Sequence, residues 1–318
     1  MLTVTALDQL AEDVRRDLGQ SPKRLQPHYL YDALGSQLFE AICELPEYRV
    51  TRAERRLLDT HTEAISAGMS SPLTVVELGA GSGEKLVQVL DPLVRAGVDV
   101  RVELVDVSAT ALELASRTLG RWSTIPVVRH QATYAVGLAQ VTERRSGSGN
   151  MLVAFLGSNL GNMDPPACRA FVATVRAGLR AGDRFVVGTD LVKPEGDLVP
   201  AYDDPLGVTA AFNKNLLLRL NRELGANFEL DQFAHRVVWN ASGSRVEMHL
   251  ESLRAQTVTI PRAGCQVDFA EGESIWTESS YKYEAAGVIA LGVGGGFGVY
   301  GQWVDAEARF AVTVFTAM

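Results

Sequence analysis

The sequence predicts an α/β protein in which a mostly parallel sheet is covered by helices on both faces. Short apolar runs alternate with helical patterns between residues 73 and 189, as in βαβ units. With 318 residues and 47% hydrophobic content, the chain can bury one large core or two modest ones. After Asp190 the alternation stops and a mixed α+β pattern follows, which indicates a second domain.

The N-terminal part is expected to be helical. Residues 5–18 and 33–45 each place apolar side chains on one helical face, and Pro46 ends the second of these helices. A loop around Glu47-Tyr48-Arg49 follows. The string Thr51-Arg52-Ala53-Glu54 has the spacing of a capping box, so a third helix is expected to open there.

Strands of the parallel sheet are expected at residues 73–78, 101–106, 127–129, 151–156 and 184–189. Helices are expected to open near Glu84, at Ser108 and after Asp164, the last with proline in its first turn. This order gives a doubly wound sheet.

The remaining chain is expected to complete both domains. Residues 202–224 read as a long helix, and 237–239, 246–253 and 257–260 read as antiparallel strands. After Glu278, a helix and two strands are expected to return to the sheet. The predicted domains are discontinuous: residues 55–191 plus 283–318 form the doubly wound domain, and residues 1–54 plus 192–282 form the second.

Composition narrows the possible partners. A formal charge of −8 without a basic run disfavours nucleic acid and anionic membrane surfaces. The apolar stretch 287–300 is too short and too rich in glycine to span a bilayer. Cys43, Cys168 and Cys265 are far apart, and the histidines show no ligand spacing, so we expect no disulfide and no metal. We expect a cytoplasmic monomer, with no signal peptide at the start.

The strongest local signal is the glycine-rich run at residues 75–83, where a strand leads through a glycine turn into a helix. Such a loop alone is weak evidence, because dinucleotide binders share it and a turn can serve packing only. Glu77 before the turn and the absence of a phosphate-loop Lys-Ser/Thr favour S-adenosylmethionine. Asp106 ends the next strand, where a carboxylate can accept both ribose hydroxyls.

Further strings spread over nearly the whole chain match one family. They include Tyr31-Asp32, Leu45-Pro46-Glu47-Tyr48, Glu77-Leu78-Gly79, Asp106-Val107-Ser108, Phe155-Leu156-Gly157-Ser158, Gly188-Thr189-Asp190, Ala201-Tyr202-Asp203-Asp204, Asn221-Arg222-Glu223-Leu224 and Thr277-Glu278. On these strings the chain resembles the histidine Nα-methyltransferases of ergothioneine biosynthesis, whose fungal relatives methylate tryptophan derivatives. The resemblance implies a Rossmann-like class I S-adenosylmethionine methyltransferase domain with a second α+β substrate-binding domain.

The resemblance also implies residue roles. The cofactor would be held by Gly79, Lys85 and Asp106, with Thr133 and Tyr134 at its adenine. The substrate amine would lie near Tyr31 and the backbone of Gly157, and the substrate carboxylate near Asn162 and Tyr202. The imidazole would meet Tyr48, Glu278 and Ser280, in a pocket lined by Phe39, Thr209 and Met248.

These residue types suit a free amino acid. An amide and a phenol can hold a carboxylate without adding a cation, and a Glu beside a Ser can accept from and donate to a neutral imidazole. Each residue also has a plainer interpretation. Tyr31 and Tyr48 could be core tyrosines, Asn162 could cap a helix, Glu278 could be a sheet-edge charge, and Met248 could be core filler.

Three departures from the family pattern keep alternatives open. Thr133-Tyr134 stands where the family has Asp-Phe, Arg49 stands where it has a second Tyr, and residues 292–301 form a longer glycine-rich segment, expected as a loop that could alter substrate choice. The leading hypothesis is conversion of L-histidine to its Nα-trimethyl form, hercynine. The alternatives are another aromatic amino acid such as tryptophan, a non-catalytic cofactor binder, and an NAD-dependent dehydrogenase, which is disfavoured because no Tyr-x-x-x-Lys is found.

Overall fold

The chain folds into two compact units, described separately below. The structure is a computed structural model that describes residues 4–145 and 147–318. The larger unit consists of Arg49–Lys193 and Tyr281–Met318, and the smaller one of the chain up to Tyr48 with Pro194–Ser280.

The first boundary lies between residues 48 and 49, whereas the sequence placed it between 54 and 55. The reason is helix α3 (Val50–Ser66), which packs along its length on α4 (Glu84–Arg95) and on strands of the larger unit. Val50, Ala53 and Leu57 are buried in that packing. The helix therefore cannot be divided between two cores.

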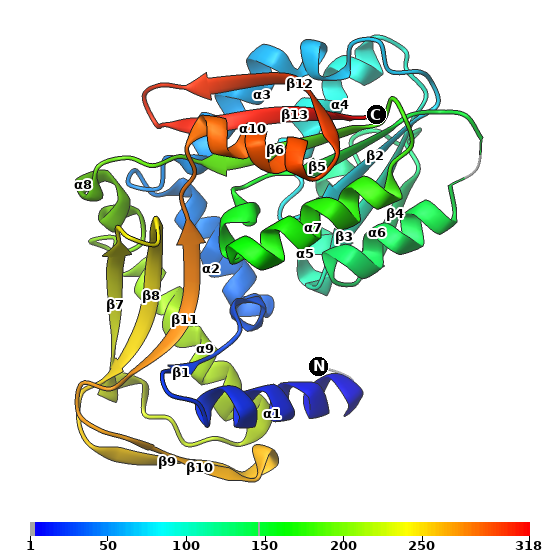
Figure 1. The fold of residues 1–318 in the computed structure, drawn as a ribbon. Coiled ribbons are helices and arrows are strands. Elements are labelled where there is room, and N and C mark those ends of the chain that lie inside the picture. The colour runs from blue at the N-terminus through cyan, green and yellow to red at the C-terminus, as the bar shows by residue number, and fades with distance from the viewer. Residues whose placement is uncertain (1–3, 146) are drawn as a thin grey trace. The chain divides into compact units, whose positions relative to one another are not determined.

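The larger unit is built on a seven-stranded sheet in the order β12-β13-β6-β5-β2-β3-β4 (Figure 1). The strand bounds are β2 Leu73–Leu78, β3 Val100–Asp106, β4 Val127–Gln131, β5 Met151–Phe155, β6 Arg184–Asp190, β12 Phe297–Asp305 and β13 Phe310–Ala317. The first five strands pair in parallel, and β13 runs antiparallel to both of its neighbours. The predicted parallel sheet and the return of the C-terminal strands are confirmed.

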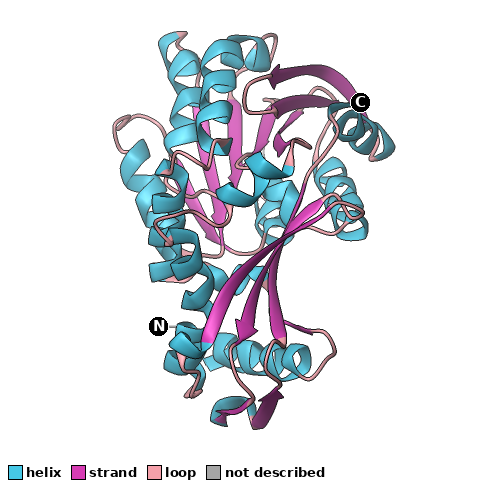
Figure 2. Ribbon diagram, turned by 90° about the vertical axis from the view of Figure 1, so that its left-hand side faces the viewer, coloured by secondary structure: helices cyan, strands magenta, loops and turns pink. Residues whose placement is uncertain are grey.

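Helices cover both faces of this sheet (Figures 1 and 2). On one side α3 packs on α4 and α4 on α5; on the other, α7 packs on α6 and α10. The further bounds are α5 Ala109–Leu119, α6 Tyr134–Glu143, α7 Pro165–Gly178 and α10 Ala285–Gly294. Under α6 and α7 lies a core of interlocking rings, with the centroids of Phe155 and Phe171 4.7 Å apart. Burial of these rings, together with the aliphatic side chains of the same core, stabilises the unit.

Of the four helix starts predicted in the larger unit, three are confirmed and the one at Thr51 is wrong. Helix α4 begins at Glu84, as expected. Ser108 caps α5 by accepting from Ala111 N, and Asp164 caps α7 by accepting from Ala167 N. The expected capping box at Thr51 and Glu54 does not form, because α3 already begins at Val50 and Thr51 Oγ1 has no hydrogen-bond partner among the described residues. Both side chains are buried instead.

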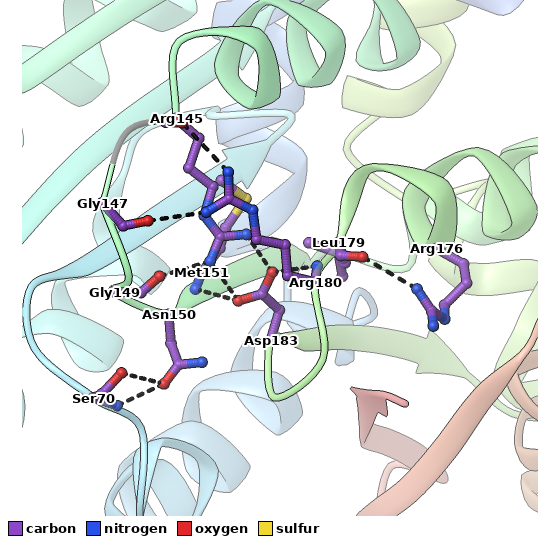
Figure 3. Close-up of polar contacts among 10 residues, drawn as sticks. All are labelled: Ser70, Arg145, Gly147, Gly149, Asn150, Met151, Arg176, Leu179, Arg180 and Asp183. Carbon is purple, nitrogen blue, oxygen red and sulfur yellow. Dashed lines mark hydrogen bonds and ion pairs between the residues drawn. The ribbon is translucent and has the colours of Figure 1, made fainter.

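A buried ion pair anchors the loop that leads into β5 (Figure 3). Asp183 accepts from the Arg145 guanidinium, from Met151 N at 2.8 Å and from Arg180 N at 2.7 Å. Arg145 also donates to the Gly149 carbonyl at 2.6 Å. Because every polar atom of this carboxylate is engaged, the network fixes the loop ends without leaving a buried charge unpaired.

The glycine-rich segment at residues 292–301 is not a loop, contrary to expectation. Its first part ends α10, and from Phe297 onward it belongs to β12, which pairs antiparallel with β13. A Cβ on Gly292 would lie 2.1 Å from the Phe315 ring, so glycine there lets the helix approach the sheet. The segment is part of the sheet and its cover.

The smaller unit packs helices on a four-stranded sheet in the order β1-β11-β8-β7. Its bounds are α1 Val4–Leu18, β1 Lys23–Arg24, α2 Ala33–Glu44, α8 Glu195–Leu198, α9 Val208–Leu224, β7 Phe233–Asn240, β8 Arg245–Ser252, β9 Gln256–Ile260, β10 Cys265–Phe269 and β11 Ser274–Tyr281. Strands β9 and β10 form a separate antiparallel ribbon.

Helix α9 begins at Val208 rather than at residue 202. Gly207 before it has φ +72°, and the Asp204 carboxylate accepts from the backbone N–H groups of Val208 and Thr209 at 3.0 and 2.7 Å. Residues 195–201 form short helical turns of their own. Within the described part of the chain, no helix is long and apolar enough to cross a membrane.

Candidate functional site

The glycine turn after β2 lies where the strand order of the larger unit reverses, between β2 and β5. Open α/β sheets bind ligands at the carboxyl ends of the strands at such a reversal. Gly79 has φ +84°, and its N–H donates to Val105 O at 2.8 Å. A Cβ there would lie 2.9 Å from Asn159 Nδ2 and 3.4 Å from the Tyr134 hydroxyl. The left-handed backbone conformation therefore favours glycine at position 79, and a side chain there would also displace Asn159.

Two carboxylates end the strands beside this turn. Glu77 is buried, and its Oε2 has no hydrogen-bond partner among the residues that the structure describes. Burial raises the pKa of Glu77 well above its usual value, although the Lys85 ammonium opposes this shift. Burial also raises the pKa of Asp106, against the effect of backbone N–H groups that include those of Ser108, Gly81 and Ala80. An unpaired buried carboxylate is costly, so Glu77 points to a missing donor or cation.

A third buried carboxylate, Glu54, joins two of the expected site residues. Its Oε2 lies 2.6 Å from Lys85 Nζ, and its two oxygens accept from Gly157 N at 2.9 and 2.8 Å. Gly157 has φ +76°, and Ser158 after it is also left-handed with φ 61°. Lys85 and Gly157 are thus brought together by a residue that the sequence analysis had assigned to helix capping.

The residues expected at adenine and one of the two expected at the substrate carboxylate, Asn162, lie in the larger unit, whereas Tyr202 lies in the smaller one. Tyr134 begins α6 with its ring against Phe155 at 5.0 Å, and burial raises its pKa. Thr133 is the exposed N-cap residue of α6, and its side chain makes no cap hydrogen bond. Asn162 is the last residue of a 3₁₀ turn, Asn159–Asn162, after β5, and it caps no helix, since Asp164 caps α7.

In the smaller unit, a chain of aromatic rings connects several expected substrate residues. The centroid of Tyr31 lies 5.5 Å from that of Phe39, Phe39 lies 6.3 Å from Tyr48, and Tyr48 lies 6.4 Å from Tyr202, all edge to face. Phe212 of α9 closes the cluster at 5.4 Å from Tyr31. Edge-to-face contacts order the rings, which matters for a site that must orient a planar ligand.

The ring chain ends in a hydrogen-bonded network. The Tyr202 hydroxyl donates to Ser280 Oγ at 2.8 Å, and its backbone carbonyl accepts from His235 Nε2 at 2.8 Å. Asn213 Nδ2 donates to His235 Nδ1 at 2.9 Å. With Nδ1 accepting, His235 is the neutral Nε2–H tautomer, and it fixes the backbone of Tyr202.

The other expected substrate residues lie in the same unit. Thr209 is in the first turn of α9, Met248 is on β8, and Glu278 is on β11 two residues before Ser280. All three side chains are buried, Glu278 at 8% exposure. Glu278 is therefore not the exposed sheet-edge charge that the plainer interpretation offered.

The sequence analysis missed Glu54, His235 and Asn213. For Glu54 a signal was present, since the residue lies on the apolar face of α3 beside the buried Ala53 and Leu58. A carboxylate on such a face must be paired. His235 and Asn213 gave no such signal, because their partners come from distant parts of the chain.

The groups around the glycine turn fit a cationic nucleoside cofactor. The orphaned Glu77 oxygen suits a positive group, the Gly79 backbone leaves no side chain at the turn, and Asp106 offers a carboxylate to ribose hydroxyls. Among the described residues, no group of His, Cys, Asp or Glu side chains is arranged to hold a metal ion.

Comparison with known proteins agrees with this geometry. Residues 10–317 match the family model described as histidine-specific methyltransferase, SAM-dependent. The chain is 39% identical over 311 residues to the histidine N-alpha-methyltransferase of Mycolicibacterium smegmatis, covering 98% of this chain and 95% of that one. The corresponding enzyme of Mycobacterium tuberculosis is 36% identical over 306 residues, covering 96% and 94%.

A more distant relative is ergothioneine biosynthesis protein 1 of Schizosaccharomyces pombe, 28% identical over 275 residues, which are 83% of this chain and 35% of that protein. The resemblance expected from the sequence strings is confirmed, as is S-adenosylmethionine as the cofactor. The chain belongs to the family of S-adenosylmethionine-dependent, histidine-specific methyltransferases.

Proposed function

We propose that the protein methylates the α-amino group of L-histidine up to Nα,Nα,Nα-trimethylhistidine (hercynine), a step of ergothioneine biosynthesis. The full-length match to a histidine-specific family carries this proposal. Two relatives bear the name histidine N-alpha-methyltransferase, and the match to this chain covers at least 94% of each relative's length. The buried Glu278 and Ser280 support the choice of an imidazole side chain.

The larger unit is proposed to bind the cofactor through Gly79, Lys85 and Asp106, with Thr133 and Tyr134 at the adenine. When bound, S-adenosylmethionine supplies a methyl group already activated on a sulfonium. The buried carboxylates favour this cation electrostatically. The Tyr134 ring, ordered against Phe155, offers a flat apolar wall, while the Thr133 hydroxyl is a weaker acceptor than the family's Asp.

The smaller unit is proposed to bind histidine. Glu278 would accept from an imidazole N–H and Ser280 would donate to the other ring nitrogen, with Tyr48 against the ring. Phe39, Thr209 and Met248 would line the pocket. Ser280 Oγ accepts from the Tyr202 hydroxyl at 2.8 Å, a contact that orients this serine.

The remaining roles concern the polar end of the amino acid. Asn162 and Tyr202 are proposed to hold its carboxylate without a cation that would oppose the sulfonium. Tyr31 and the Gly157 backbone are proposed to orient its amine. The amine must react as the neutral base, and water can take the proton released at each transfer, so no dedicated base is needed.

Turnover and binding test the proposal together. Purified protein with S-adenosylmethionine should convert histidine to a trimethylated product by mass spectrometry, while tryptophan and tyrosine remain unmethylated. Calorimetry with S-adenosylhomocysteine present should show selective histidine binding that is lost in Glu278→Ala. Turnover of another aromatic amino acid would overturn the substrate, and tight cofactor binding without turnover on any amino acid would overturn the enzymatic assignment.

We further propose that the protein acts as a cytoplasmic monomer. The scattered cysteines, which form no disulfide among the described residues, and the net negative charge support this. Light scattering on the purified protein tests the monomer, and a second species at twice the mass would contradict it.

A further inference from the structure

Glu54 is the most thoroughly enclosed charge near the glycine turn. Its side chain is 0% exposed, and it reaches from α3 toward the carboxyl ends of β2 and β5. Both carboxylate oxygens accept from Gly157 N, and one lies 2.6 Å from Lys85 Nζ. Every partner is therefore either expected at the cofactor or expected at the amine.

The fold leaves space for this carboxylate. Gly188 on β6 has no side chain, and a Cβ there would lie 1.8 Å from Glu54 Oε1. A Cβ at position 188 would be fixed to the β6 backbone, and three contacts hold the Glu54 carboxylate. Neither group could therefore move easily to relieve the clash. The three elements α3, β6 and the loop after β5 together form a pocket for Glu54.

The charge arrangement gives Glu54 a task beyond packing. Lys85 forms an ion pair with Glu54 and also lowers the pKa of Glu77. The negative charges of Glu54 and Asp106 raise that pKa. One ammonium therefore serves several carboxylates. Its position decides how much negative charge the glycine turn presents, and Glu54 holds that position.

We propose that Glu54 is a positioning residue for methyl transfer, fixing the Lys85 ammonium and the Gly157 peptide in the orientation that cofactor binding requires. This inference rests on the proposed roles of Lys85 and Gly157. It makes the charge of Glu54, and not only its shape, part of the cofactor site. Removing that charge should weaken the cationic S-adenosylmethionine more than the uncharged-sulfur product, S-adenosylhomocysteine, whereas a purely structural defect would weaken both equally.

Glu54→Gln tests this because it keeps the size of the side chain and removes the charge. We expect calorimetry to show a roughly tenfold or larger rise in the Kd of S-adenosylhomocysteine, and a still larger rise for S-adenosylmethionine. Glu103→Gln is the matched control. Glu103 is also buried in the larger unit and also ion-paired, with Arg101 Nε at 2.5 Å, but it lies on β3 away from the carboxyl end of that strand. It should leave both Kd values within about twofold.

Lys85→Met completes a double-mutant cycle. If Glu54 acts through Lys85, adding Glu54→Gln to Lys85→Met should raise the Kd of S-adenosylhomocysteine by much less than it does in the wild type. Should Glu54→Gln fail to fold, Glu54→Asp keeps the charge and shortens its reach by one methylene. That variant should fold and still bind S-adenosylhomocysteine several-fold more weakly.

The inference is overturned if Glu54→Gln, or the folded Asp variant, binds both ligands like the wild type. It is also overturned if Glu54→Gln weakens S-adenosylmethionine and S-adenosylhomocysteine equally, or if Glu54→Gln and Glu103→Gln weaken binding to the same extent. These measurements need no amino acid, so they stand even if the enzyme methylates tryptophan rather than histidine. That latter result would overturn the proposed substrate alone.

Discussion

The two units build their expected binding residues from different chemistry. In the larger unit the groups around the glycine turn are ionisable: Glu54 and Glu77 are buried, and Asp106 and Lys85 are half-buried. In the smaller unit the expected binding residues are mostly aromatic and neutral. Hydrogen bonds there join the hydroxyls of Tyr202 and Ser280, and the Asn213 amide to the His235 imidazole. The difference matches the ligands proposed for them. A cationic cofactor is favoured by the negative electrostatic potential of nearby carboxylates. A free amino acid must instead be recognised by the shape and polarity of its carboxylate, amine and side chain.

The sharpest test of that difference is Glu278→Ala, because Glu278 is the buried carboxylate assigned to substrate in the smaller unit. We expect kcat/KM for histidine to fall by roughly 100-fold or more, since the imidazole loses its charged acceptor in a dry site. The Kd of S-adenosylhomocysteine should change less than about twofold. A large loss of cofactor affinity in this variant would show that the two sets of residues are not chemically separate.

Next in size is Glu77→Gln, which should trade stability against binding. Burial raises the pKa of Glu77, so the native state favours the protonated form. The stability from this group is fully present below its unfolded pKa and is lost as pH rises through the folded one. At pH 8 without ligand, Glu77→Gln should therefore be more stable than the wild type by about 1–3 kcal/mol.

Urea unfolding of both proteins between pH 5 and pH 8 measures this effect. The advantage of the variant should grow with pH, while its affinity for S-adenosylmethionine should fall by roughly tenfold. A variant less stable than the wild type at pH 8 would mean that Glu77 already has a good partner in the unliganded protein.

The sequence predicted the larger unit better than the smaller one, and the reason is locality. Each parallel strand is a short apolar run, and the caps at Ser108 and Asp164 use residues within the same turn. In the smaller unit, the start of α9 depends on Asp204 and Gly207. Strand β11 shows no strong alternation in its sequence, and the short alternating run of β10 was overlooked.

The candidate sites divide along the same line. Gly79 and Asp106 could be placed from the strand and turn that carry them. The Thr-x-x-Glu spacing at Thr51 and Glu54 was misinterpreted as a capping box. The same spacing occurs here because Glu54 makes a tertiary contact with Gly157, and the sequence alone does not distinguish the two cases. For His235 the sequence indicated only that the histidines lack metal-ligand spacing, and the fold shows that it contacts the backbone of Tyr202.

A smaller effect is expected from Tyr202→Phe, which removes the hydroxyl that donates to Ser280 Oγ at 2.8 Å. A neutral hydrogen bond contributes about 1 kcal/mol, so histidine affinity should fall roughly five- to tenfold with the S-adenosylhomocysteine Kd unchanged. Tyr29→Phe is the control in the same unit, because the Tyr29 hydroxyl donates to Asp13 at 2.6 Å and not to any of the expected substrate residues. If both variants bind histidine equally, the Tyr202 hydroxyl has no part in recognition, either through Ser280 or at the substrate carboxylate.

The smallest expected effect concerns His235 and has the opposite pH dependence to that of Glu77. Burial lowers the pKa of His235, although the Tyr202 carbonyl, Asp203 and Asp204 oppose the shift and Lys214 adds to it. A proton on Nδ1 would also face the Asn213 Nδ2 donor and break that hydrogen bond. The stability from neutral His235 is therefore present above its unfolded pKa of about 6.5 and is lost as pH falls through the lower folded value.

Between pH 7 and pH 5, wild-type protein should thus lose up to about 1 kcal/mol more stability in urea unfolding than His235→Gln, whose amide does not titrate. Nitrogen-15 NMR of the His235 ring should show the Nε2–H tautomer at pH 7, as the donor Asn213 requires. Equal losses in the two proteins, or an Nδ1–H tautomer, would remove the neutral hydrogen-bond chain from Asn213 to Tyr202. The aromatic rings alone would then have to order the smaller unit's binding residues. In that case the binding residues of the larger unit would be distinguished by their charges, and those of the smaller unit by the packing of their rings rather than by hydrogen bonds.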